Sequence, residues 1–224
     1  ANPRAHLNLG IAYLDSGDAD RAIAHFVEAL KFLPTSYEDI FVAETHYNLG
    51  MAYDAKGQNS EAVAHYQNAL KLNLKEPGLY YRLGMAYSKR GQTEEALRYL
   101  EAAVRLSPGF AEAYNSMGNV LRSIGNLDGA IEKYSKAIAL RPDMPEVHNN
   151  IGSAYIEKGM PDKAIERLSV AIKLKPDYAK AHFNLANAYA SKGLTGPAVE
   201  HYRKAIELKP DYAGAYYNLA VIYK

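Results

Sequence analysis

The sequence predicts an all-α protein built from one helix-pair unit that is written repeatedly along the chain. Residues recur at a spacing of 34, so that one step back from Leu185 leads to Ile151, and one step back from Pro210 leads to Pro176. Self-similarity at a period of this length is typical of helical repeat arrays. Within each unit, apolar residues recur every three or four positions in two separate runs, which indicates two amphipathic helices.

The period predicts a single array over residues 1–224, because each unit buries its apolar face only against its neighbours. The array would contain six full units and the first helix of a seventh, at residues 3–36, 43–76, 77–110, 111–144, 145–178, 179–212 and 213–224. Since Ala1 is not an initiator Met and the sequence stops inside a unit, we interpret the chain as a segment of a longer protein.

Six additional residues, 37–42, separate the first two units. We expect them to lengthen a helix or to form a small bulge at a junction that tolerates insertion. The alternative is a local docking patch, which would require Tyr37, Ile40 and Phe41 to be exposed.

Glycine and proline predict where the helices end. With each unit numbered from 1 to 34, position 15 is always Gly, which suits the left-handed residue that terminates a helix. Position 32 is Pro in five of six units and should stop the second helix. Leu74 is the exception, where we expect Pro77 to serve instead, while Pro3, Pro77 and Pro145 should open first helices.

The recurring residues form a specific motif that begins, for example, with LGMAYDAKG at 49–57, and most units continue with Ala at position 20, an aromatic residue at 24, Ala at 27 and Pro at 32. This pattern resembles the tetratricopeptide repeat family over almost the whole chain. The resemblance implies antiparallel helix pairs stacked into a right-handed superhelical solenoid. It also implies a concave groove lined mainly by the first helices.

The composition excludes several classes of function. The net charge is +1, from 26 basic and 25 acidic residues, so no global field attracts nucleic acid or anionic lipid. The chain has no Cys, and no apolar run approaches the roughly 18 residues that a membrane helix needs. We therefore expect no nucleic-acid partner and no membrane insertion. The composition does not distinguish a cytoplasmic from a periplasmic location.

We expect no catalytic site, no metal and no cofactor in this chain. All seven His residues fall at repeat positions 4 and 23, and position 4 is otherwise Tyr, so we interpret them as framework residues. A metal site or a general base would need several groups that converge on one point. The sequence contains no Gly-rich phosphate loop and no identifiable Ser–His–Asp constellation.

Position 6 carries the clearest functional signal. It is Asn in most units, at Asn8, Asn48, Asn150, Asn184 and Asn218. An Asn side chain offers a donor and an acceptor together, so a column of them can bind the backbone of an extended peptide. The column is similar to the asparagine ladder of the O-linked N-acetylglucosamine transferase superhelix. The alternative is that these residues only solvate the groove.

Aromatic and amide residues beside this column complete the candidate groove, together with a basic centre of Arg82, Lys89 and Arg122 that could hold a carboxylate. The family's carboxylate clamp is not matched, because no unit has Lys at position 5. The candidate peptide-binding residues are Asn8, Tyr47, Asn48, Tyr81, Arg82, Lys89, Asn115, Asn119, Arg122, Asn149, Asn150, Phe183, Asn184, Asn187, Tyr217 and Asn218. Alanine at both Asn150 and Asn184 should weaken binding and leave the fold intact.

The leading hypothesis is a non-catalytic protein-interaction scaffold that holds an extended peptide segment of a partner protein. The first alternative is the substrate-selecting arm of a larger enzyme, such as a protein glycosyltransferase, or of a polysaccharide export machine. The second is a structural scaffold that self-associates through the terminal helix, where Leu219, Ile222 and Tyr223 would be open.

Overall fold

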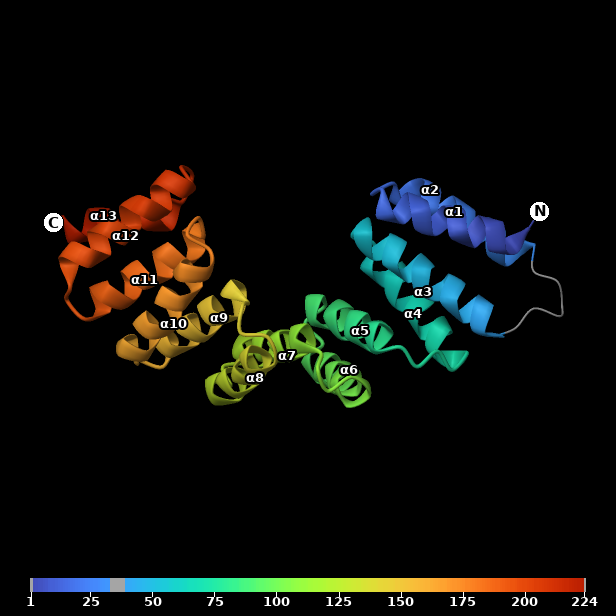
Figure 1. Ribbon diagram of the computed structural model, residues 1–224, viewed down its shortest axis with the longest axis horizontal. Coiled ribbons are helices and arrows are strands. Elements are labelled where there is room, and N and C mark those ends of the chain that lie inside the picture. Colours follow the sequence, from blue (N-terminus) through green and yellow to red (C-terminus); the bar gives the residue numbers. More distant parts are fainter. Residues whose placement is uncertain (1, 33–38, 224) are drawn as a thin grey trace. The chain divides into compact units, whose positions relative to one another are not determined.

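The computed structural model describes residues 2–32 and 39–223, and these residues form thirteen α-helices and no strand (Figure 1). The helices are α1 (Pro3–Asp15), α2 (Ala19–Lys31), α3 (Asp39–Ala55), α4 (Asn59–Lys71), α5 (Pro77–Lys89), α6 (Thr93–Leu106), α7 (Ala111–Ser123), α8 (Leu127–Leu140), α9 (Pro145–Glu157), α10 (Pro161–Leu174), α11 (Ala179–Ser191), α12 (Thr195–Leu208) and α13 (Ala213–Ile222). The prediction of an all-α protein made of helix pairs is confirmed.

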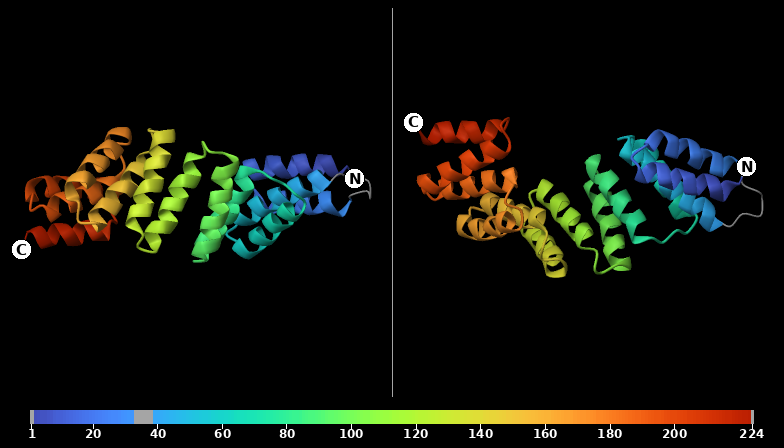
Figure 2. Two further views of the ribbon diagram at one scale, coloured as in Figure 1. Left: turned by 90° about the horizontal axis from the view of Figure 1, so that it is seen from below. Right: turned by 45° about the horizontal axis from the view of Figure 1, so that its top comes forward.

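The chain divides into two compact units, Ala1–Pro108 with α1 to α6 and Gly109–Lys224 with α7 to α13. Within each unit, the two helices of a pair pack against each other, and α3, α5, α9, α11 and α13 each pack against the second helix of the preceding pair (Figure 2). First helices also contact one another, as α1 does with α3 and α9 does with both α7 and α11. Side chains on consecutive first helices can therefore meet although they lie more than 30 residues apart in sequence.

The predicted glycine turns are confirmed. Each position-15 Gly has a positive φ of 70 to 84°, a conformation that side chains other than Gly rarely adopt, and the six are Gly17, Gly57, Gly91, Gly125, Gly159 and Gly193. The residue ends the first helix and lets the chain reverse, because its amide bonds back to a carbonyl of the last turn, as Gly159 does to Ile156.

Proline opens α1, α5 and α9 as expected, and α6, α8, α10 and α12 each end two residues before a position-32 Pro. The expectation that Pro77 stops α4 is wrong. That helix ends at Lys71, and Asn73 takes the left-handed conformation with φ 62°, while Pro77 is the first residue of α5. Asn is one of the few residues besides Gly that adopt this conformation readily. Pro34 lies outside the described residues.

Small residues let the two helices of a pair approach closely. A Cβ atom added to Gly152 would lie 2.5 Å from Cγ of Leu168, and one added to Gly118 would lie 2.5 Å from the Tyr134 ring. The repeated Ala residues at positions 20 and 27, such as Ala164, are fully buried. The core is thus a series of large side chains that fill spaces left by Gly and Ala.

The described part of the insertion, residues 39–42, forms the first turn of α3, so the expectation that it lengthens a helix is confirmed there. Phe41 is 2% exposed and packs in the core with Leu7 and Phe26, which contradicts the alternative of an exposed docking patch. Ile40 is exposed, and Tyr37 lies outside the described residues. In the described part of the chain, we find no helix that is both long and apolar enough to span a bilayer.

Candidate functional site

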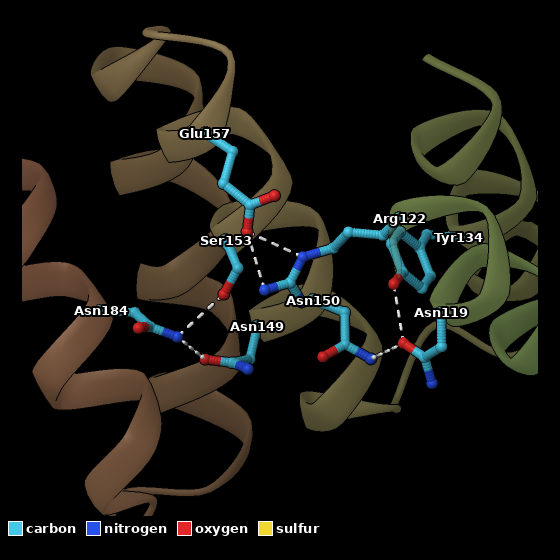
Figure 3. Close-up of polar contacts among 8 residues, drawn as sticks. All are labelled: Asn119, Arg122, Tyr134, Asn149, Asn150, Ser153, Glu157 and Asn184. Carbon is cyan, nitrogen blue, oxygen red and sulfur yellow. Dashed lines mark hydrogen bonds and ion pairs between the residues drawn. The ribbon is translucent and has the colours of Figure 1, made fainter. Parts of the chain in front are cut away.

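In the compact unit Gly109–Lys224, which we call the second unit, the side-chain amides at repeat position 6 join consecutive first helices. The side-chain amide of Asn150 on α9 donates to Oδ1 of Asn115 at 3.1 Å and to Oδ1 of Asn119 at 3.2 Å, both on α7. Figure 3 shows Asn150 reaching across to Asn119. The partners stand at positions 5 and 9 of the preceding repeat, so the bonds follow from the stacking of the repeats.

The next two repeats also bond to the repeat before them, although Asn218 uses position 24 in place of position 5. Asn184 on α11 donates to Oδ1 of Asn149 at 2.8 Å and to Oγ of Ser153 at 2.9 Å (Figure 3). Asn218 on α13 donates to Oδ1 of Asn187 at 2.9 Å and to the Tyr202 hydroxyl at 3.2 Å. The three position-6 amides therefore use both of their N–H groups inside the protein.

Two buried tyrosines set the orientation of the position-9 amides. The Tyr134 hydroxyl donates to Oδ1 of Asn119 at 2.7 Å, and the Tyr202 hydroxyl donates to Oδ1 of Asn187 at 2.6 Å. Each Oδ1 thus accepts one bond from a tyrosine and one from the next repeat. Burial raises the pKa of Tyr134 to about 12, opposed by Arg122, so the hydroxyl keeps its proton at neutral pH.

These bonds correct the expectation that each ladder residue offers both a donor and an acceptor. Within the described residues, the carbonyl oxygens of Asn150, Asn184 and Asn218 and the Nδ2 groups of Asn119 and Asn187 have no protein partner. We call Asn119, Asn150, Asn184, Asn187 and Asn218 the amide face. It presents donors from position 9 and acceptors from position 6.

The first unit has no such network. Asn48 donates to the Glu44 carbonyl of its own helix at 2.8 Å, and Asn8 is exposed. Position 9 in this unit is Ile11, Met51 or Met85, none of which has an amide oxygen to accept a bond. Among the described residues, hydrogen bonds therefore join the predicted column of Asn residues across repeats only in Gly109–Lys224.

The basic residues of the candidate groove are already paired. Asp54 lies 3.5 Å from Arg82 and 2.8 Å from Lys89, and Glu157 lies 2.8 Å from Arg122 (Figure 3). Arg122 is thus paired with Glu157, whereas Arg82 and Lys89 share the single carboxylate of Asp54, so the three cations face only two carboxylates. The basic centre that could hold a carboxylate therefore stays a prediction.

The remaining candidates divide into packed and accessible side chains. Phe183 stacks on Tyr212 with ring centroids 4.7 Å apart, and Tyr47 lies 6.0 Å from the Tyr66 ring, so both aromatics pack partly within the array. Tyr217 is 71% exposed. The prediction that Asn149 contacts a bound peptide is wrong, because its side chain is fully buried. Asn149 is linked to the amide face through its bond to Asn184. Tyr81 is half-buried.

Two pockets lie beside the free donors of the amide face. One of about 350 Å³ is lined by Asn119, Arg122, Ser123 and Glu157. The other, of about 280 Å³, is lined by Asn187, Ala190, Tyr202, Asn218, Val221 and Ile222. Each has room for one side chain of a ligand, the first beside a paired cation and anion and the second against more apolar groups.

Tyr134, Tyr202 and Ser153 also belong to this site and were not among the residues predicted from the sequence. A detectable signal exists for the tyrosines, because Asn at position 9 and Tyr at position 24 occur together, 15 residues apart, only in the fourth and sixth repeats. In the second repeat position 9 is Met51, which has no side-chain oxygen that could accept a bond from the buried Tyr66. Within residues 2–32 and 39–223, no three His, Asp or Glu side chains lie close enough together to hold a metal ion.

Family models match most of the chain. Models described as tetratricopeptide repeat match residues 3–75, 77–110, 179–212 and 201–224, and a model described as TPR repeat matches residues 118–159 and 152–193. A search of curated protein sequences finds no match.

Solved structures share the architecture. A crystal structure of MamA is 30% identical, with a TM-score of 0.67, and the match covers 74% of this chain and 96% of that one. YrrB, described as a TPR protein with an unusual peptide-binding site, is 25% identical with a TM-score of 0.68 over 86% of this chain and 96% of its own. PilF of Pseudomonas aeruginosa is similar in fold alone, at 18% identity and a TM-score of 0.81 over 98% and 97% of the two chains.

Proposed function

Because the chain belongs to the tetratricopeptide repeat family, we propose that it is a non-catalytic protein-interaction scaffold whose amide face binds an extended segment of a partner protein. The observation that carries the proposal is the set of unpaired groups on this face. Nδ2 of Asn119 and Nδ2 of Asn187 have no protein partner, and each borders a pocket.

An extended peptide has complementary groups along its whole length. Its backbone carbonyls can accept from the position-9 amides, and its backbone N–H groups can donate to the oxygens of Asn150, Asn184 and Asn218. Such contacts hold a peptide without selecting its side chains. Selectivity would come from the pockets, where the Arg122–Glu157 pair favours a polar side chain and Val221 with Ile222 favours an apolar one.

The likeness to YrrB supports a peptide ligand, since that protein is described as having a peptide-binding site. We expect the affinity for a partner to depend little on the partner's charge. The cations of the second-unit site are neutralised in place, as Arg122 is by Glu157, so affinity should change little with ionic strength.

The test must remove the outward donors and keep the internal bonds. Asn119→Asp and Asn187→Asp each retain an oxygen that accepts from the tyrosine and from the next repeat, but they replace the outward N–H groups with an oxygen. Asn126→Asp is the matched control, because it makes the same chemical change in an exposed turn where the oxygen caps α8 through the Gly129 amide.

Peptides selected by the wild-type protein from a display library would be measured against all three variants by fluorescence anisotropy. A hydrogen bond of about 1 kcal/mol predicts a loss of affinity of about fivefold at each groove position and none at the control. Equal affinity in all variants would contradict the proposal. The Asn150→Ala/Asn184→Ala variant is a poorer test than the sequence suggested, because both amides also connect helices.

A second candidate function is self-association through α13. Tyr216, Tyr217 and Val221 of that helix are 50%, 71% and 55% exposed, which is a large apolar and aromatic surface for one helix. Light scattering over a concentration series would test it, and a constant monomer mass would rule it out.

A further inference from the structure

Repeat positions 4 and 23 face each other across the two helices of a pair, and three repeats place His at both positions. Nδ1 of His6 lies 3.0 Å from Nδ1 of His25, and the same distance separates His182 from His201. His46 and His65 are 2.9 Å apart in the same way. Other repeats have Tyr80 with Tyr99, Tyr114 with Lys133, and His148 with Arg167. The two columns are visible in the sequence, but their pairing follows only from the packing of the helices.

The proton positions of the last pair follow from a third contact. Nε2 of His182 lies 3.0 Å from the Pro176 carbonyl oxygen, which can only accept, so His182 carries its proton on Nε2. Nδ1 of His182 is then bare, and the bond between the rings requires His201 to donate from Nδ1. Of the two bare nitrogens of the neutral pair, only Nε2 of His201 accepts no bond from the described residues.

This arrangement limits how many protons the closed repeat can accept. A first proton on Nε2 of His201 leaves the bond between the rings intact. A second proton would have to occupy Nδ1 of His182, where it would point at the N–H of His201 and break the bond. We propose that each histidine pair is a proton-sensitive latch, which holds the two helices of its repeat together until acid adds a second proton.

The charged surroundings of the His182–His201 pair do not offset this limit. Tyr189 of α11 stacks on His201 with ring centroids 5.8 Å apart. From α12, Lys204 is held by Glu207 at 2.7 Å, and Arg203 donates to the hydroxyl of Tyr223, which follows α13. Burial is the largest cause that lowers the pKa of His201, and the charge of His182 lowers this pKa further. Glu200 raises it, and no residue of α9 or α10 contributes to the shift.

The other two pairs have similar surroundings. Tyr53 stacks on His65 and Tyr13 stacks on His25, each with ring centroids 5.3 Å apart. The guanidinium of Arg21 lies 5.5 Å from the centroid of the Tyr13 ring. Burial lowers the pKa of His46, and the charge of His65 adds to that effect. Burial also lowers the pKa of His65.

The geometry favours a shared proton over a shared metal ion. The ring centroids of His182 and His201 are 5.2 Å apart while their Nδ1 atoms are 3.0 Å apart, so the rings meet end to end. A tetrahedral Zn²⁺ ion would need nitrogens about 3.3 Å apart whose lone pairs converge at an angle. A pocket of about 600 Å³ lined by both rings gives water, and hence protons, access to this pair.

The sign of the pH effect follows from proton counting. Separated helices bind two protons per pair below a pH of about 6.5, the ordinary His pKa, whereas the closed pair binds at most one. Acid therefore favours opening, and stability is fully present above about pH 6.5 and lost as the pH falls. A difference of one proton corresponds to about a tenfold rise in the opening equilibrium constant for each pH unit.

Hydrogen exchange of the full chain between pH 7.5 and 5.0, corrected for intrinsic exchange rates, would test the latch. Opening of α11 and α12 should rise by up to about tenfold per pH unit below pH 6.5. The pair α7 and α8 lies in the same unit and has no His, so it should respond less. An equal response in both pairs would overturn the proposal.

A variant adds an independent test. His182→Tyr with His201→Tyr installs the residues that the third repeat has at these positions, and it should abolish the excess acid response of α11 and α12. If this variant does not fold, long-range ¹H–¹⁵N spectra of the wild-type protein decide the matter. They should show bare nitrogens at Nδ1 of His182 and Nε2 of His201, and any other tautomer pair would overturn the latch.

Discussion

The side-chain amide of Asn184 donates to Oδ1 of Asn149 at 2.8 Å, and this bond joins a partly exposed residue to a fully buried one on the preceding first helix. Asn184 thus contributes to the stacking of two repeats as well as to the surface proposed for peptide binding. The same holds for Asn150 and Asn218, which bond across to the preceding repeat.

We predict that Asn184→Ala lowers the free energy of unfolding by about 1–3 kcal/mol, because it leaves the buried oxygen of Asn149 without a donor. Urea denaturation followed by circular dichroism would measure the loss. Asn48→Ala is the matched control at the same repeat position, since Asn48 bonds only within its own helix and its loss should cost little. Equal losses in the two variants would argue against a role of the amide in stacking.

We predict that Gly152→Ala destabilises the protein although Ala is the better helix former. The new Cβ would lie 2.5 Å from Cγ of Leu168, which is fully buried and cannot swing away. Overpacking of this kind costs about 1–3 kcal/mol and exceeds the gain of about 1 kcal/mol in helix propensity. Gly196→Ala, where no atom lies within 4 Å of the added Cβ, should leave the thermal midpoint unchanged or raise it. A higher midpoint for Gly152→Ala would show that the core can relax.

Alkaline pH should weaken the fold partly through Tyr134. Burial raises its pKa from 10.0 to about 12, so the unfolded chain loses this proton first and stability falls as the pH rises from about 10 to about 12. Tyr134→Phe should cost about 1 kcal/mol at neutral pH through the lost bond to Asn119 and should show a shallower alkaline decline. Urea midpoints at pH 8.5 and pH 11 would measure both effects. Tyr217→Phe, at an exposed residue, should leave the decline unchanged.

The Arg122–Glu157 pair should contribute little to stability despite its 2.8 Å contact. The two side chains are 31% and 42% exposed, and exposed ion pairs contribute about 0–1 kcal/mol. A double-mutant cycle with Arg122→Ala and Glu157→Ala should give a coupling energy in that range, and 1 M salt should reduce it. A coupling energy well above 1 kcal/mol at high salt would mean that the pair acts as part of the buried network around Tyr134.

Local sequence patterns were sufficient to predict the fold class and the helices of each repeat. The 34-residue period, the apolar spacing and Gly at position 15 predicted the helix pairs and their turns, because helix formation and chain reversal depend on residues close together in sequence. The prediction that Pro77 ends α4 was wrong, because both Pro and a left-handed Asn can end a helix. Asn73 takes that conformation directly after α4.

The hydrogen bonds of the candidate residues could not be predicted from these local patterns. The position-6 amides meet partners 31 and 35 residues away, and the His residues at positions 4 and 23 meet 19 residues apart across the two helices of a pair. Composition alone does not show which N–H groups these contacts use and which remain free. The physical reason is that a hydrogen bond depends on angles and on distances within a few tenths of an ångström, and these arise only when the helices pack.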